Sequence, residues 1–272
     1  MTQLLREVVH SFHEHDGFFL AAGLSFYVVI CVVPFVLLLI AGGGFLLSDE
    51  TAVQEVVSQL GEIVPVYQRE MEQILMGVVR ASGVSTLLGT AILLLFATQL
   101  FAATRFVLNR ILGMKGRGFF RGVLFDLSMI VVLTLLFFVT MGVTALFAWM
   151  KSLVILFRHG FIFSSLVEWT GLFLAVMFNT ALFVLLYRVV PRERIPWSSV
   201  LAGSVTAALL WEFAKQLFRL YIQGADVYRT VHGPLGVLIA LVMWVYYSAI
   251  VFVLGAELIR VLEGRRSEGA PV

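Results

Sequence analysis

The sequence predicts an all-α integral membrane protein: a bundle of six transmembrane helices, with an N-terminal interfacial amphipathic helix and a helical outer loop. A membrane-spanning helix needs about 20 mostly apolar residues. Six stretches of this length, or nearly so, contain no Asp, Glu, Lys, Arg or His. They are Gly17–Ser48, Ala81–Thr104, Leu127–Met150, Trp169–Tyr187, Ile195–Trp211 and Gly233–Ala256.

The composition agrees with this class. Of the 272 residues, 60% are hydrophobic and 13% are charged, whereas about half of a soluble domain is apolar and about a quarter is charged. The six stretches and their connections occupy nearly all of the chain. We therefore expect one membrane domain over residues 17–258 and a short tail over 259–272, without a separate soluble catalytic domain.

Residues 1–16 predict a short amphipathic helix that lies in the membrane interface, because apolar and polar residues separate at helical spacing. The apolar face is formed by Leu4, Leu5, Val8, Val9 and Phe12, and the polar face by Gln3, Arg6, Glu7, His10 and Glu14. His13, His15 and Asp16 add to a cluster that resembles a set of metal ligands. Only His10 and Glu14 share a helical face, so we expect no metal site there.

The first apolar stretch is longer than one span requires. Its 32 residues would extend about 48 Å as a helix, against about 30 Å of hydrocarbon. Pro34 predicts a kink, and Gly42–Gly44 predict a helix end or a close backbone approach. The outer loop over residues 48–80 then predicts two amphipathic helices separated by Pro65.

The charges of the connecting segments predict the orientation, because Lys and Arg accumulate on the cytoplasmic side of short loops. Twelve of the 19 basic residues fall on one side: Arg6, Arg105, Arg110, Lys115, Arg117, Arg121, Arg188, Arg192, Arg194, Arg260, Arg265 and Arg266. The outer loop instead carries Asp49, Glu50, Glu55, Glu62, Glu70 and Glu72 against Arg69 and Arg80. Both termini are therefore predicted to be cytoplasmic.

The fifth stretch carries the most unusual polar pattern. Ser204, Ala208, Glu212 and Gln216 recur every four residues and share one helical face. Lys215 follows Glu212 at i+3, near enough to form an ion pair. An adjacent stripe of Ser199, Gly203 and Ala207 permits close approach of a neighbouring helix.

Other polar residues follow the same logic on the other spans. Asp126 begins the third span and can pair with Arg121 or Arg105. The candidate intramembrane polar or substrate-path residues are Arg105, Asn109, Asp126, Glu168, Asn179, Glu212, Lys215 and Glu257. Spacing on single helices does not show that these residues meet, so local structural pairing and a shared polar cavity both stay open.

Enzyme signatures are absent from the sequence, which contains no GxSxG, HExxH, CxxC or Walker-type motif. We expect neither an enzyme nor a bound cofactor. The basic loop over residues 105–121 is interpreted as a topology determinant beside anionic headgroups rather than as a nucleic-acid site, because it lacks interleaved aromatic residues.

Several motifs resemble the YihY/BrkB family of bacterial inner-membrane proteins. They are the run from Ala21 to Tyr27 followed by Pro34, Leu108–Ile111, Pro196-Trp197, Leu210–Glu212, Gly233–Gly236, Trp244–Tyr246 and Gly255–Leu258. The resemblance implies a six-helix bundle in the bacterial inner membrane. Cys31 replaces the usual serine, and His232-Gly233-Pro234 replaces a more usual Tyr-Gly-Ser.

The resemblance implies no securely established activity. Some members carry a ribonuclease label, which fits poorly because this chain offers no clustered metal ligands or acid–base residues. Others are linked to envelope integrity or lipid handling. The polar faces of spans two, four and five, and a basic cytoplasmic loop suited to anionic headgroups, favour a transport role, with membrane lipids as partners and a lipid or another amphiphile moved across the membrane. The alternative is an envelope scaffold that binds proteins through the acidic outer loop, and a homo-oligomer is compatible with either hypothesis.

Overall fold

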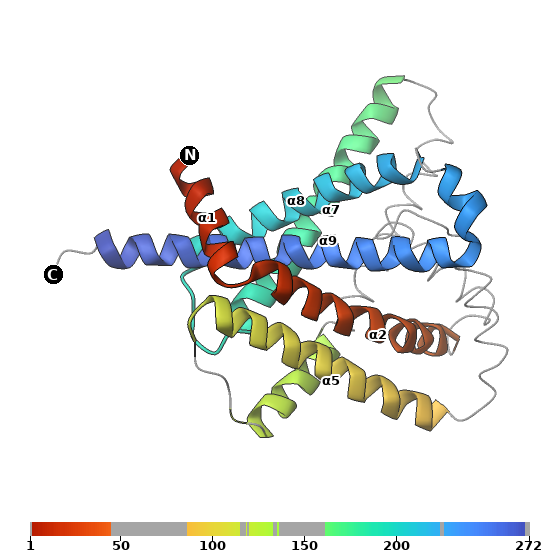
Figure 1. Cartoon of the computed structure of the whole chain (residues 1–272), viewed down its shortest axis with the longest axis horizontal. Coiled ribbons are helices and arrows are strands. Elements are labelled where there is room, and N and C mark those ends of the chain that lie inside the picture. Colours follow the sequence, from red (N-terminus) through yellow and green to blue (C-terminus); the bar gives the residue numbers. More distant parts are fainter. Residues whose placement is uncertain are drawn as a thin grey trace.

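The computed structural model describes residues 2–44, 86–114, 118, 120–132, 135, 161–223 and 226–269. These residues are helical apart from short connections, which confirms the all-α class. The helices are α1 (Thr2–Glu14), α2 (Gly17–Gly44), α5 (Thr86–Ile111), α7 (Phe161–Val189), α8 (Trp197–Gln223) and α9 (Asp226–Gly269) (Figure 1). A further helical segment occupies 120–132.

Helix α9 lies at the centre of the bundle. It packs against α8, α2, α1 and α5, while α7 packs on α8 and α5 on α2. In Figure 1, α2 and α5 lie on one side of α9 and α8 lies on the other, while α7 crosses α9 in this view. A helix that is apolar on all sides buries its surface by packing against neighbours on several faces. The last predicted span therefore forms the core around which the other helices assemble.

Two pairs of small residues bring α8 close to α9. A Cβ atom added to Gly203 would lie 2.8 Å from the Gly255 carbonyl oxygen and would also clash with Ile259. A Cβ atom added to Gly255 would lie 2.9 Å from that of Ala207 and would clash with the hydroxyl of Tyr187. The predicted stripe of small residues on the fifth stretch therefore allows close contact between these helices.

The buried hydroxyl of Tyr187 fastens α7 to the same region. It donates a hydrogen bond to the Phe252 carbonyl oxygen at 2.7 Å, and its ring stacks on Phe252 with ring centres 5.2 Å apart. On the other side of the bundle, the Cys31 thiol donates to the Phe96 carbonyl oxygen at 3.0 Å. The cysteine at this position therefore still provides a hydrogen-bond donor between α2 and α5.

The predicted N-terminal helix exists and turns sharply into the bundle. The helices over Gln3–Glu14 and Gly17–Cys31 meet at 66°, and Asp16 between them has a positive φ of 54°. The Asp16 carbonyl oxygen accepts hydrogen bonds from the Phe19 and Leu20 amides at 2.8 and 3.0 Å. It thereby satisfies two free donors in the first turn of α2.

Both chain termini lie at one end of the molecule. Figure 1 shows the C-terminal end of α5 and the connection between α7 and α8 at this same end. Helix α5 stops there in a Schellman motif, in which Gly113 has a φ of 67° and the Met114 amide bonds to the Asn109 carbonyl oxygen at 2.9 Å. The end of α5, the connection between α7 and α8 and the two termini thus lie at one end of the molecule.

Large apolar side chains cover the outside of the described helices. Phe19 is 79% exposed, Phe173 is 68% exposed and Phe213 is 65% exposed. Exposed apolar surface of this kind is expected where lipid rather than water surrounds a protein. In the part of the chain that the structure describes, Ile239–Arg266 is long and apolar enough to cross a membrane, and the bent pair α1–α2 would provide a second crossing.

Six crossings therefore stay a prediction. Most of the predicted third span, Leu127–Met150, and the outer loop over 48–80 lie outside the described residues. The kink expected at Pro34 also stays a prediction, although this residue lies within α2.

We expect Gly203→Ala to destabilise the protein, because the new methyl group meets backbone and Ile259 rather than open space. Overpacking of this kind costs about 1–3 kcal/mol. The matched control is Gly23→Ala on α2, where a Cβ atom meets nothing within 4 Å. Thermal unfolding in detergent should show a lower midpoint for Gly203→Ala and an unchanged or higher one for Gly23→Ala. Equal midpoints would contradict the close contact of α8 with α9.

Candidate functional site

Three groups of polar side chains contain the candidate residues that the structure describes. We name them by a central residue: the Glu257 cluster joins α1, α5 and α9, the Glu212 cluster joins α7 and α8, and the Arg105 cluster joins α5 to segment 120–132. Each cluster pairs at least one ionised group with a partner, as expected where few waters are present to solvate a charge.

Glu257 is fully buried and accepts two hydrogen bonds from the N-terminal region. The Ser11 hydroxyl donates to its Oε2 atom at 2.7 Å. His15 Nδ1 lies 2.9 Å from Oε1. Because Ser11 is on α1 and His15 is at the bend between α1 and α2, this carboxylate on α9 fixes both elements against the bundle.

Arg260 completes the Glu257 cluster one turn along α9. Its guanidinium donates to the Ile111 carbonyl oxygen at 2.7 Å, at the C-terminal end of α5, and also contacts His15 Nε2. The His15 ring therefore lies between the Arg260 guanidinium and the Glu257 carboxylate.

An exposed ion pair joins α1 to α9 beyond this cluster. The Arg265 side chain donates to both carboxylate oxygens of Glu7 at 2.7 Å. This hydrogen bonding lowers the pKa of Glu7 below its ordinary value. Since the folded pKa is depressed, any stabilisation from the pair is present near neutral pH and is lost as pH falls through that pKa.

In the Glu212 cluster, two donors converge on one carboxylate oxygen. Lys215 Nζ lies 2.7 Å from Glu212 Oε1, which confirms the predicted i+3 pair. Asn179 of α7 donates to the same oxygen at 2.7 Å. The side chains of Lys215 and Glu212 are 12% and 11% exposed. Ser204 and Ala208 are buried on the same face, whereas Gln216 is exposed.

The Arg105 cluster resolves the choice of partner for Asp126. Arg105 Nη1 lies 3.0 Å from Asp126 Oδ1, whereas Arg121 is exposed. Gly122 makes this approach feasible, because a Cβ atom there would lie 2.7 Å from Arg105 Nη1. Asn109 is buried nearby on α5, and its Oδ1 has no hydrogen-bond partner among the described residues. Glu168 belongs to α7, but its side chain is outside the described part.

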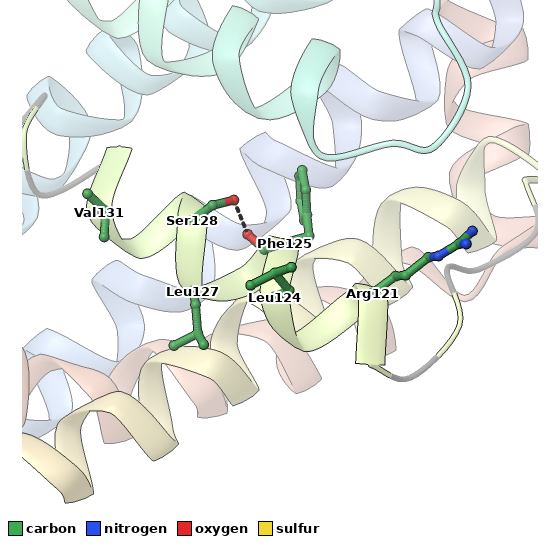
Figure 2. A pocket seen from close by; sticks show the side chains of 6 residues that line it. All are labelled: Arg121, Leu124, Phe125, Leu127, Ser128 and Val131. Atoms are coloured by element: carbon green, nitrogen blue, oxygen red, sulfur yellow. Dashed lines mark hydrogen bonds between the residues drawn. The ribbon is translucent and has the colours of Figure 1, made fainter.

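Two hollows lie apart from these clusters. One, of about 460 Å³, is open along segment 120–132 (Figure 2). The residues that line it are Arg121, Leu124, Phe125, Leu127, Ser128 and Val131. The other, of about 360 Å³, lies between α2 and α5 and includes Tyr27, Gln99 and Phe106. Neither hollow is lined by a residue of the three clusters, so these two spaces do not form the shared polar cavity that was one of the two alternatives.

The histidines near the N-terminus point to different partners. His10 Nδ1 lies 3.6 Å from Glu14, His13 Nδ1 bonds to the Val9 carbonyl oxygen at 2.8 Å, and His15 belongs to the Glu257 cluster. The sequence pattern places His15 in a metal-like group and indicates no site role for Ser11 or Arg260. The one sequence signal for the Glu257 cluster is the spacing of Ser11 and His15, which places them one helical turn apart.

These helices, with apolar exteriors and paired charges between them, define an α-helical membrane protein. Residues 8–271 match the family model described as virulence factor BrkB. The chain therefore belongs to the BrkB family, as the resemblance implied. No solved structure matches this chain.

Relatives named UPF0761 membrane protein are similar over varied lengths. The relative from Photobacterium profundum is 28% identical over 95% of this chain and 82% of its own length. The one from Chromohalobacter salexigens is 29% identical over 97% of this chain and 64% of its own length. The one from Alcanivorax borkumensis is 38% identical over 37% of this chain. In the last two comparisons the match covers less than two thirds of the relative, 64% and 25%.

Replacing Glu257 by Ala should destabilise the fold strongly, because Ser11 and His15 lose their buried acceptor and Arg260 loses the nearby anion. Breaking a buried charged network costs about 3–5 kcal/mol. Glu7→Ala removes another carboxylate between α1 and α9, but this one is exposed, and we expect only a small change. Limited proteolysis of the N-terminal region and the thermal midpoint measure both effects. Similar behaviour of the two variants would contradict a structural role for the Glu257 cluster.

Proposed function

We propose that this protein crosses the bacterial inner membrane six times, with both termini in the cytoplasm, and moves a lipid or another amphiphile between the leaflets. The orientation is supported by the shared location of the two termini (Figure 1). It is also supported by the arginines at this end, because basic segments face the cytoplasm. The proposal needs no catalytic residue and no cofactor.

The Glu212 cluster carries the proposed transport role. Charged side chains within a membrane are expensive and usually face a bundle interior or a polar pathway. Leu209, Phe213 and Leu217 are exposed on another face of α8, where they would face lipid. The Glu212 cluster therefore lies between helices, behind an apolar surface.

The hydrogen bonding of Glu212 leaves capacity for a ligand. Asn179 and Lys215 both approach Oε1, and in the described residues no donor approaches Oε2. A carboxylate oxygen can accept more than one hydrogen bond. We infer that Oε2 accepts from a polar headgroup, while Lys215 can transfer its contact to a headgroup phosphate.

The Arg105 cluster supports the same proposal from the other half of the bundle. Its ion pair is also largely buried and lies between α5 and segment 120–132. A pathway for an amphiphile needs polar groups along its length, with apolar surface for the acyl chains. The two clusters supply polar groups on different helix pairs, and the outer helix faces supply the apolar surface.

The test uses purified protein in liposomes that contain a fluorescent phospholipid, together with a quencher that cannot cross the membrane. Wild-type protein should expose more label to the quencher than protein-free liposomes do. Glu212→Gln should slow this exposure about tenfold, the effect of losing about 1.4 kcal/mol in the crossing step. Glu7→Gln is the control, because Glu7 lies in an exposed pair far along the sequence from this cluster.

The result that would overturn the proposal is equally specific. The proposal is overturned if folded wild-type protein shows no excess quenching. It is also overturned if Glu212→Gln exposes the label as fast as wild type, because the Glu212 cluster would then have no role in lipid movement. Function would then be sought in proteins that bind the acidic outer loop over 48–80, whose residues lie outside those described.

A further inference from the structure

One half-buried cation differs from the others in the described part of the chain. Arg105 pairs with Asp126, Lys215 with Glu212, and Arg260 with the Ile111 carbonyl oxygen. Arg188, at the end of α7, is also half-buried. Among the described residues it has no carboxylate or carbonyl acceptor, and its Nη1 atom is enclosed without a hydrogen-bond partner.

An aromatic ring holds this guanidinium in place. The central guanidinium carbon of Arg188 lies 4.9 Å from the centre of the Trp197 ring. Trp197 is the first residue of α8 and is 57% exposed. A cation stacked on an indole loses little further freedom when it binds an anion. The contact therefore orients Arg188 and leaves part of its side chain accessible.

The surroundings of this pair are positively charged. Arg192 and Arg194 are exposed in the connection between α7 and α8. Arg266 of α9 donates to the Ser198 hydroxyl at 2.7 Å, next to Trp197. The nearby carboxylates do not neutralise Arg188: Glu193 is exposed without a contact to it in the described residues, and Glu263 contacts Ser199 and Arg266.

We propose that Arg188 and Trp197 form a binding site for the phosphate group of an anionic phospholipid. A partly buried guanidinium without a counter-ion is costly, and a phosphate oxygen pair matches its two parallel N–H donors. Tryptophan is favoured at membrane interfaces, where its ring contacts the acyl region and its edge faces the headgroups. This site lies on the α7–α8 connection and is separate from the Glu212 cluster.

The experiment measures lipid selectivity by native mass spectrometry. Protein purified in detergent is mixed with equal amounts of phosphatidylglycerol and phosphatidylcholine, and the ratio of the two bound lipids is recorded. Wild type should prefer phosphatidylglycerol, and Arg188→Gln should lower the ratio about fivefold, the effect expected for one interfacial cation. Trp197→Leu should lower it in the same direction.

Arg110→Gln is the matched control, because Arg110 is an exposed arginine in the last turn of α5 at the same end of the molecule. We expect it to change the ratio by less than about twofold. Equal losses in Arg188→Gln and Arg110→Gln would overturn the proposal, since bulk charge would then explain the preference. Arg188→Lys keeps the charge without the two-pronged geometry, and should retain the fold with an intermediate ratio.

A second arm distinguishes lipid phosphate from free phosphate. Thermal unfolding in lipid-free detergent is followed with and without inorganic phosphate, for wild type and Arg188→Gln. Stabilisation of wild type alone, without a preference for phosphatidylglycerol, would support phosphate recognition and assign it to a soluble anion. If wild type shows neither a preference for phosphatidylglycerol nor stabilisation by phosphate, the proposed site is overturned.

Discussion

The arrangement of this bundle depends on the burial of one carboxylate. Glu257 has no exposed surface, so its charge must be compensated by protein groups rather than by water. Ser11 and His15 supply the hydrogen bonds, and Arg260 supplies the nearby positive charge. Ser11 lies on α1, His15 lies at the bend between α1 and α2, and Arg260 lies on α9 and also bonds to the end of α5. A single buried charge therefore determines how four helices meet.

The remaining contacts follow a related rule, in which each neighbouring helix pair has its own close contact. Gly203 allows α8 to approach α9, while Asn179 joins α7 to α8 through Glu212. The Arg105–Asp126 ion pair joins α5 to segment 120–132. Polar interactions between membrane helices are short-ranged and specific in geometry. The charged residues of the described helices therefore join separate helix pairs.

Much of the helical fold could be predicted from the sequence, because apolar stretches and small-residue stripes are local patterns. The Lys215–Glu212 pair could be predicted for the same reason. The hydrogen bond from Asn179 to Glu212 spans 33 positions, and that from Ser11 to Glu257 spans 246. Partners so distant depend on the packing order of the helices, which spacing along one helix does not encode. The sequence therefore predicted Glu212 and Glu257 as candidates, but not the donors that distinguish them.

The hydrogen-bond donors around Glu257 and Glu212 distinguish a structural carboxylate from one suited to ligand exchange. Both oxygens of Glu257 lie within hydrogen-bond distance of side chains of the N-terminal region, and the residue has no surface open to a ligand. Glu212 is also buried, although its side chain keeps 11% of its surface exposed, and its described donors share one oxygen. A buried charge whose partners are all fixed contributes to assembly, whereas one with an open acceptor can change partners at little added desolvation cost. This difference in hydrogen bonding is why the transport proposal rests on Glu212 and not on the more deeply buried Glu257.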